Sequence, residues 1–394
     1  MSVDINKKLI TTAPVSFIEP DKFAKGPEKG MALCLSGGGY RAMVFHLGAL
    51  IRLNETGLLR TLKRISSVSG GSITAGVLGL KWSKLNFNAD NVAVSLIDEI
   101  VNPVRDMASR TIDYPSVLKG KLWFGTVADK VVKSYDSVLF HGATLQDLPS
   151  DTEGPRFVLN ATNVQSGALW RFSKPYMADY LVGRWPNPKV PLAMAVAASS
   201  AFPPFLSPAT LDLNPRAVLP DRKAPLHKSP YIKQAVLTDG GVYDNLGLET
   251  AWKRYQTILV SDGGGQMEAD EKPASEWALH TKRILDVVDN QVRCLRKRQL
   301  IESFKLKSGS MSRSGAYWGI RTQIKDYELA DALDCPEKKT QKLADIDTRL
   351  KELKKSDQEK LINWGYAVCD AALRKHLDKG IEKPKGFPYP AADV

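Results

Sequence analysis

Residues 31–42, MALCLSGGGYRA, contain the part of the sequence that decides the fold. A short apolar run, MALCL, ends in a serine and three consecutive glycines, and a segment with helical spacing, RAMVFHLGALIRLNETGLL, follows at once. Continuous apolar runs of this length are typical of strands that are buried on both faces of a sheet. Apolar residues then recur on one helical face, and Gly57 can end the helix. The sequence therefore predicts a strand, a tight turn and a helix here.

Further short apolar runs with the same character follow along the chain and are separated mostly by helical segments. They are RISSV (64–68), RFVLNA (156–161), AVLT (235–238) and TILVS (257–261). Strands that alternate with helices predict an α/β fold with a mostly parallel sheet covered on both sides. Functional residues in such folds follow the carboxyl ends of the strands, so we expect the site after residues 35, 68 and 238.

The chain divides into three parts by composition. Residues 1–30 are predicted to be a loosely organised leader, and residues 31–270 a single catalytic body. Within that body, the segment 180–235 is rich in proline and is expected to form loops around one short helix. Residues 271–394 are charged and mostly helical, interrupted by the strand-like GAYWGIRTQI, and we expect them to pack on the core as a covering layer.

Composition limits the location and the partners of the protein. The 43% hydrophobic and 25% charged residues are ordinary for a soluble globular chain, whereas a net charge of +12 implies attraction to anionic partners. The four cysteines form no C-x-x-C pair, which favours a reducing compartment. Neither a secretory apolar stretch nor a run long enough to span a bilayer is visible. The sequence predicts a cytoplasmic protein whose contact with membranes is peripheral.

The first candidate for chemistry is the turn SGGGYRA, residues 36–42. Gly37, Gly38 and Gly39 have no Cβ, so their N–H groups can point at an oxyanion or a phosphate at the start of the helix. A dinucleotide-binding turn is the competing interpretation, because GGGYRA fits G-x-G-x-x-A. That fold needs an acidic residue at the end of the second strand, and RISSVSGGS has none.

The second candidate is SSVSGGSITAG, residues 66–76. Ser69, followed by Gly70 and Gly71 on a strand-to-helix turn, can project its hydroxyl above the sheet, as in a nucleophile elbow. The following helix directs its positive end at a developing anion. A Ser/Gly-rich loop that only caps the helix is the alternative interpretation.

The third candidate is LTDGGVYDN, residues 237–245. Asp239 precedes Gly240 at a predicted strand end, where its carboxylate can stay free, although Asp-Gly is also a common turn signal. A serine nucleophile, a carboxylate base and backbone donors at one sheet edge are the set of groups that acyl transfer requires.

None of the five histidines lies in a comparable motif, and His46, inside the predicted helix, is interpreted as structural. A Ser–Asp dyad without histidine is therefore the simplest assignment. No cluster of His, Cys or carboxylate ligands accompanies the motifs, so the sequence predicts no metal and no cofactor, and activity should persist in excess EDTA.

Together these segments resemble the patatin-like phospholipases. The matching segments are GGGYR (37–41), SVSGG (67–71), LNATNVQSG (159–167), ASSAFPPF (198–205) and DGG (239–241). The resemblance covers roughly residues 30–265 and keeps the family's order of motifs. Two positions differ from the usual pattern: Ser67 replaces the first glycine of the elbow, and Ser36 stands where many members have aspartate.

The resemblance implies a three-layer α/β/α sandwich and a lipid acyl hydrolase that cleaves fatty acyl esters of phospholipids. Ser69 would attack the acyl carbonyl to form an acyl-enzyme, Asp239 would take its proton, and the N–H groups of Gly37, Gly38 and Gly39 would hold the oxyanion. Arg41 would fix the glycine turn through its donors. Gly71 and Gly240 would support the two motifs that carry the dyad.

The sequence leaves two further functions open. One is a basic module that binds a membrane or nucleic acid after catalysis has decayed; the retained serine, aspartate and glycines count against it, and no nucleic-acid-binding signature is present. The other is the same fold acting on a lysophospholipid, galactolipid, neutral glyceride or thioester, since loops of unknown shape form the acyl pocket.

The segment 281–307 is the candidate for the contact with an anionic membrane. Its apolar residues fall on one helical face and its basic residues gather in the second half. The apolar set is Ile284, Leu285, Val288, Val292 and Leu295, and the basic set is Arg293, Arg296, Lys297, Arg298, Lys305 and Lys307. The alternative is a helix whose apolar face packs on the core and whose basic side is solvated.

Overall fold

The computed structural model describes residues 27–112, 127–220, 224–392 and 394. Strand β1 (Glu28–Leu35) begins inside the segment 1–30 that the sequence predicts as a leader. Most of that leader lies outside the described residues.

The described strands form one sheet in the order β10-β9-β1-β2-β3-β4-β5-β6, with β8 on β3 and β7 on β8. After β1 the bounds are β2 (Arg64–Val68), β3 (Arg156–Asn163), β4 (Ala168–Phe172), β5 (Tyr176–Asp179), β6 (Gly183–Pro186), β7 (Ala209–Asp212), β8 (Gln234–Asp239), β9 (Tyr255–Asp262) and β10 (Ser314–Gly319). Neighbours from β10 to β3 run parallel, whereas the pairs beyond β3 are antiparallel. The predicted α/β fold with a central parallel sheet is confirmed, and the antiparallel extension is an addition that the sequence did not predict.

Strand β1, in the centre of the sheet, buries apolar residues on both of its faces. Ala32 and Cys34 pack into the core on one face, and Leu33 and Leu35 pack into the core on the other. Because successive side chains of a strand point to opposite faces, a strand covered on both sides favours apolar residues on both of them.

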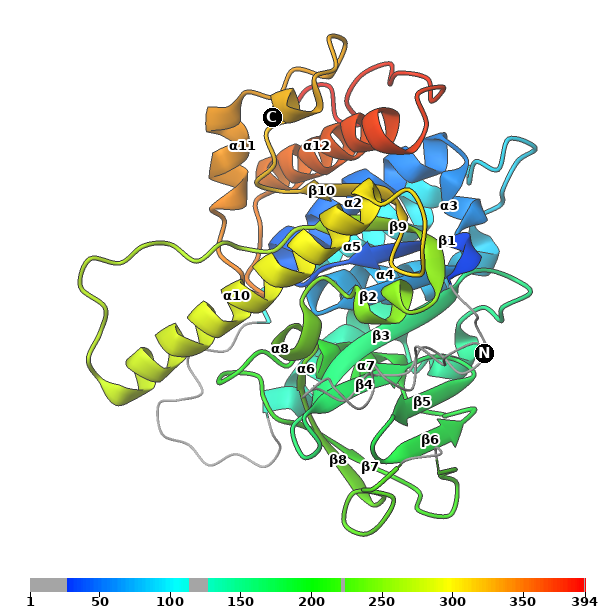
Figure 1. Cartoon of the computed structure of the whole chain (residues 1–394), viewed down its shortest axis with the longest axis vertical. Helices are drawn as coiled ribbons and strands as arrows, with labels where there is room; N and C mark the ends of the chain where they lie inside the picture. Colours follow the sequence, from blue (N-terminus) through cyan, green and yellow to red (C-terminus); the bar gives the residue numbers. More distant parts are fainter. Residues whose placement is uncertain (1–26, 113–126, 221–223, 393) are drawn as a thin grey trace, which may run out of the picture.

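Helices cover both faces of the sheet (Figure 1). They are α2 (Gly39–Glu55), α3 (Leu58–Thr61), α4 (Gly70–Leu80), α5 (Asn102–Ala108), α6 (Val127–Tyr135), α7 (Leu192–Ser199), α8 (Gly241–Asp244), α9 (Glu249–Trp252), α10 (Trp277–Lys305), α11 (Glu337–Ala344) and α12 (Lys355–Ala372). Helices α2, α4 and α12 share the larger core. The region from Leu246 to α9 and the C-terminal half of α10 cover the opposite face. No helix in the described part of the chain is both long and apolar enough to cross a membrane.

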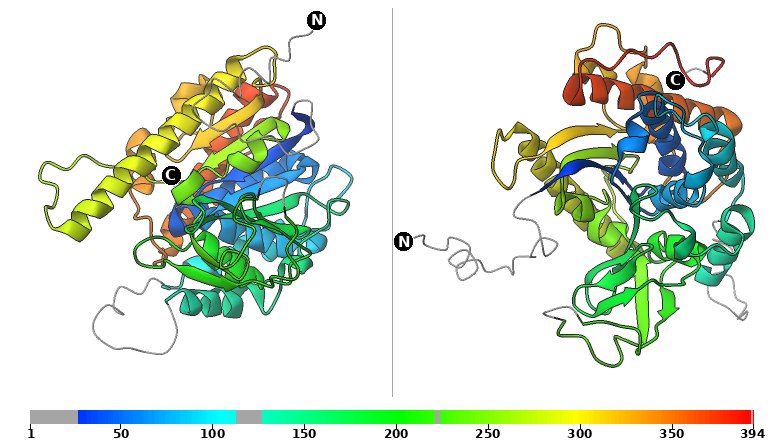
Figure 2. Two further views of the ribbon diagram at one scale, coloured as in Figure 1. Left: turned by 60° about the horizontal axis from the view of Figure 1, so that its bottom comes forward. Right: turned by 90° about the vertical axis from the view of Figure 1, so that its right-hand side faces the viewer.

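The C-terminal part of the chain is built into this architecture. Strand β10 pairs with β9 inside the sheet, and α12 lies against α2, which the right view of Figure 2 also shows. The two helices approach so closely that a Cβ placed on Gly365 would lie 2.0 Å from the carbonyl oxygen of Phe45. Only glycine permits this distance between helix backbones.

Strand β8 reaches the centre of the sheet from an unexpected direction. It runs antiparallel to β3, with Asp239 opposite Ala161, while Val68 at the end of β2 lies opposite Asn160. Because β3 extends past β2, the last residue of β8 ends beside the end of β2. The aspartate therefore meets the serine without β8 being parallel to the central strands.

Candidate active site

The turn between β2 and α4 places Ser69 in a strained conformation. Ser69 has φ 52° and ψ −122°, a region that residues with a side chain rarely adopt and that recurs at functional sites. Ser69 is nearly buried, with 8% of the surface of the residue exposed. Helix α4 begins at Gly70 and directs its N-terminal N–H groups at the same point. The backbone thus has the strand-to-helix turn, with a strained serine at its centre, that the elbow prediction requires.

Asp239 lies next to this serine at the end of β8. Its Oδ1 accepts a hydrogen bond from the Gly241 N–H at 2.7 Å, and the hydroxyl of Ser69 is close enough to lower the pKa of the carboxyl. The Thr162 hydroxyl donates to the Asp239 backbone carbonyl at 2.9 Å. The structure therefore brings together the two residues of the predicted dyad.

Burial raises the pKa of Asp239 to about 7. The two hydrogen bonds to its carboxylate lower the pKa, and the negative charge of Asp289 on α10 raises it, but burial is the largest cause. A buried carboxyl with this pKa can both release and accept a proton near neutral pH, which is what a general base requires.

The glycine turn offers two free donors instead of the three that the sequence predicts. The Gly37 N–H donates to the carbonyl of Asn245 at 3.0 Å, and the Tyr40 N–H donates to the carbonyl of Arg349 at 2.9 Å. No group in the described part of the chain accepts a hydrogen bond from the N–H of Gly38 or Gly39. The turn lies beside the nucleophile, since a Cβ on Gly37 would be 3.1 Å from the Ser69 Cβ.

Gly71 and Gly240 let the elements of the site approach one another. A Cβ on Gly71 would lie 2.5 Å from the carbonyl oxygen of Leu35, and one on Gly240 would lie 2.3 Å from that of Asn160. These distances are far inside van der Waals contact. Both glycines therefore support the site by allowing backbone contact.

His46 is buried and holds the start of the glycine turn. Its Nε2 donates to the carbonyl of Ser36 at 2.9 Å, so its Nδ1 accepts from the Ser261 hydroxyl at 2.8 Å. Burial lowers its pKa to about 4, so the ring is neutral at physiological pH. Since both ring nitrogens are occupied, His46 has the structural role that the sequence predicts.

Arg41 does not contact the glycine turn in the way the sequence predicts. Its Nε donates to the carbonyl of Gly263 at 3.2 Å, and its two terminal nitrogens donate to the carbonyl of Ile346 and, at 2.9 Å, to the Thr348 hydroxyl. Support for the turn is indirect, because a Cβ on Gly38 would lie 2.7 Å from the same Gly263 carbonyl oxygen. Arg41 thus joins the C-terminal segment to the loop on which the turn packs.

Sequence reasoning missed the polar network beneath the elbow. The Ser69 N–H donates to Ser199 Oγ at 3.1 Å, and the Ser199 hydroxyl donates to the carbonyl of Asn160 at 2.6 Å. The Asn160 amide donates to the carbonyl of Ser67 at 2.9 Å. Both residues lie in segments that carried the family resemblance, which was the only signal for them.

The two departures from the family pattern have partners in the structure. Ser67 is a strand residue whose buried hydroxyl lies 3.0 Å from Ser72 Oγ, so this position needs no glycine. Ser36 Oγ accepts the Gly263 N–H at 2.8 Å. Each serine therefore stabilises the turn that it precedes.

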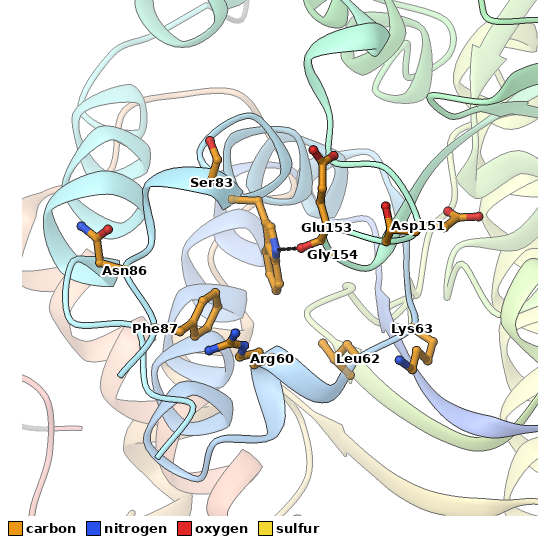
Figure 3. Close-up of a pocket in the computed structure, with 11 residues that line it drawn as sticks. Arg60, Leu62, Lys63, Ser83, Asn86, Phe87, Asp151, Glu153 and Gly154 are labelled. Carbon is orange, nitrogen blue, oxygen red and sulfur yellow. Dashed lines mark hydrogen bonds between the residues drawn. The ribbon is translucent and has the colours of Figure 1, made fainter. Parts of the chain in front are cut away.

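A cleft of 420 Å³ lies at the amino ends of β2 and β3, where Lys63 and Gly154 precede the two strands (Figure 3). Ser69 follows β2, so this cleft is at the opposite edge of the sheet. A second cavity, of 330 Å³, lies beside the carboxyl ends of β9 and β10 and includes Asp262 and Arg293. Within the described ranges, no cluster of His, Cys, Asp and Glu could hold a metal ion.

The sheet presents a strained serine, a buried carboxylate and free backbone donors at one edge, an arrangement suited to the hydrolysis of acyl esters. The chain belongs to the patatin-like phospholipase family, whose sequence profile matches residues 33–252, more than half of the chain.

Solved structures give a likeness of fold. Human GIVD cytosolic phospholipase A2 superposes with a TM-score of 0.51 at 12% identity, over 88% of this chain and 60% of that one. Its complex with methyl gamma-linolenyl fluorophosphonate gives a TM-score of 0.49 at 14% identity, over 87% of this chain and 57% of that one. VipD from Legionella pneumophila gives a TM-score of 0.37 at 15% identity, over 94% of this chain and 73% of that one. The chain thus spans about 60% of the phospholipase A2 length. No curated protein matches the sequence.

Proposed function

We propose that this protein hydrolyses fatty acyl esters of phospholipids through a Ser69–Asp239 dyad. One observation carries the proposal: Ser69, strained at the turn between β2 and α4, adjoins the buried carboxyl of Asp239, whose pKa burial raises to about 7. The unpaired N–H groups of Gly38 and Gly39 lie at the adjoining turn. A nucleophile, a base and oxyanion donors are thereby supplied by three separate elements.

The reaction proceeds in two halves with one proton carrier. Ser69 Oγ attacks the acyl carbonyl carbon as its proton passes to Asp239, and the oxyanion accepts hydrogen bonds from Gly38 and Gly39. The tetrahedral intermediate collapses, and the leaving alkoxide takes the proton from Asp239. Water then attacks the acyl-enzyme and gives a proton to Asp239, which returns it to Ser69 as the fatty acid leaves.

Apolar side chains near the dyad favour a lipid ester over a small polar one. Phe202 and Phe205 are partly exposed, and Phe202 follows Ala201, whose carbonyl accepts the Asp239 N–H at 2.9 Å. Val242, three residues after Asp239, is also exposed. Exposed apolar groups around a polar reaction centre suit an acyl chain.

The test is fatty acid release from mixed phospholipid vesicles, read by mass spectrometry. Ser69→Ala and Asp239→Asn should each reduce release to near background, and the double variant should lose no more than either single one, because the pair acts as a unit. Asp90→Asn, an exposed carboxylate in a loop, is the matched control and should keep full activity. Full activity in either dyad variant would refute the assignment.

A further inference from the structure

Helix α10 presents its apolar side to solvent. Trp277, Ile284, Val288 and Leu295 are 79%, 49%, 54% and 57% exposed. Their spacing of 7, 4 and 7 residues places them on one face of an α-helix. The sequence-based interpretation in which this face packs on the core is therefore wrong.

Three basic residues of α10 are turned toward the body of the protein. Arg293 pairs with Asp262 at 3.3 Å, and Arg296 pairs with Glu249 at 3.0 Å. Lys297 lies 3.8 Å from Asp262. These ion pairs hold the second half of the helix against the sheet, so these three cations are not the solvated basic side that the sequence suggested. Arg298 and Lys305, by contrast, are exposed.

The N-terminal half of α10 extends away from the sheet, as Figure 1 and the left view of Figure 2 both show. The contacts of α10 with the body of the protein concentrate in the C-terminal half of the helix, where Leu300 is fully buried. Soluble monomers rarely leave a long apolar stripe uncovered, and such stripes mark interaction surfaces. A tryptophan at the outer end of an amphipathic helix suits the boundary between lipid headgroups and acyl chains.

We propose that the outward face of α10, defined by Trp277, Ile284, Val288 and Leu295, docks on an anionic phospholipid bilayer. The inference rests on the proposed function, because it supplies the surface through which a lipid hydrolase reaches its substrate. A net charge of +12 attracts the protein to anionic lipid and opposes pairing with a second copy.

The docking face is mechanically joined to the dyad. Arg296 donates to the carbonyl of Tyr243 at 3.4 Å, and Tyr243 belongs to α8, which begins two residues after Asp239. The charge of Asp289 on the same helix acts on Asp239. A bilayer that holds α10 therefore holds the carboxyl edge of the sheet at a fixed position relative to the lipid.

The binding test uses Ser69→Ala protein, so that the vesicles stay intact. The variant carries Ile284→Gln, Val288→Gln and Leu295→Gln, and a matched control carries Val94→Gln and Leu219→Gln, which are exposed apolar residues outside α10. Co-sedimentation with vesicles of equal parts phosphatidylcholine and phosphatidylserine should fall at least about tenfold in the variant and stay unchanged in the control. Tryptophan emission should shift to the blue on binding, and Trp277→Phe should remove most of that shift.

Unchanged vesicle binding in the α10 variant would overturn the proposal. Binding that stays unchanged while the variant alone converts a dimer to a monomer would assign the face to a second copy and also overturn it. In protein with Ser69 restored, the α10 variant should turn over a soluble short-chain ester at the normal rate. Failure of docking thus leaves ester hydrolysis in place, whereas failure of the proposed function leaves vesicle binding in place.

Discussion

At the scale of single residues, the proposed base Asp239 should set the pH dependence of catalysis. Its pKa of about 7 means that the base is protonated, and inactive, below that pH. We therefore expect kcat/KM on a soluble ester to rise with pH and level off above about 7. Because the charge of Asp289 raises the pKa of Asp239, Asp289→Asn should move this rise to lower pH. A flat profile from pH 5 to 9 would contradict the role of Asp239 as base.

The same buried carboxyl lowers the stability of the protein as the pH rises. The pKa of Asp239 is about 7 in the folded protein, whereas its ordinary value, expected in the unfolded chain, is 3.8. Below pH 3.8 both states are protonated; between 3.8 and about 7 only the folded state keeps the proton, so the free energy of unfolding falls with pH across this window.

Asparagine at position 239 carries no charge at any pH. The Asp239→Asn variant therefore does not lose this part of the free energy of unfolding as the pH rises. Its free energy of unfolding should gain on that of the wild type as the pH rises from 4 to 7, by a few kcal/mol, on the order of the pKa shift. Urea unfolding at several pH values measures it, with Asp90→Asn as the exposed control. A constant difference across this range would show that Asp239 titrates normally.

At the scale of elements, the elbow depends on Ser199 at the end of α7. Without its hydroxyl, the Ser69 N–H and the Asn160 carbonyl lose their partner. Ser199→Ala should lower kcat roughly 10- to 100-fold with KM little changed, because the nucleophile is displaced. Its stability should fall by about 1–3 kcal/mol.

Ser200→Ala is the matched control for this substitution. Ser200, the residue after α7, is also buried, but its hydroxyl donates to the carbonyl of Val196 at 2.8 Å and lies 3.2 Å from Tyr135 Oη. We expect its kcat to stay near that of the wild type. If both variants lose activity equally, the effect belongs to α7 as a whole and not to the contact between Ser199 and the elbow.

The parts of the site that the sequence predicted are local, and the parts that it missed are not. A strand, a glycine turn and a helix are encoded within a few residues, so Ser69, Asp239 and the glycines could be found. Ser199, which accepts the hydrogen bond from the Ser69 N–H, is 130 residues away in the sequence. The carbonyl that accepts the hydrogen bond from the Gly37 N–H belongs to Asn245, which is also distant in the sequence. Such pairs are created by strand order, which no local pattern specifies.

The direction of β8 and the orientation of α10 show the same limit for the fold. AVLT is an apolar run whether the strand is parallel or antiparallel, so only the pairing of Asp239 with Ala161 reveals its direction. The apolar face of α10 follows from residue spacing, but whether that face points inward depends on Asp262 and Glu249, which attract the basic face.

At the scale of the whole molecule, the C-terminal region is part of the folding unit that positions the site. Helix α12 crosses α2 where a Cβ on Gly365 would lie 2.0 Å from the Phe45 carbonyl oxygen, and α2 begins at the glycine turn. Gly365→Ala would force the helices apart and should lower the free energy of unfolding by about 1–3 kcal/mol, even though alanine favours a helix by about 1 kcal/mol. A Cβ on Gly386 would meet no atom within 4 Å, so Gly386→Ala should unfold like the wild type in urea. Equal stability of both variants would mean that α12 is not held against α2, and that the core folds independently of residues 271–394.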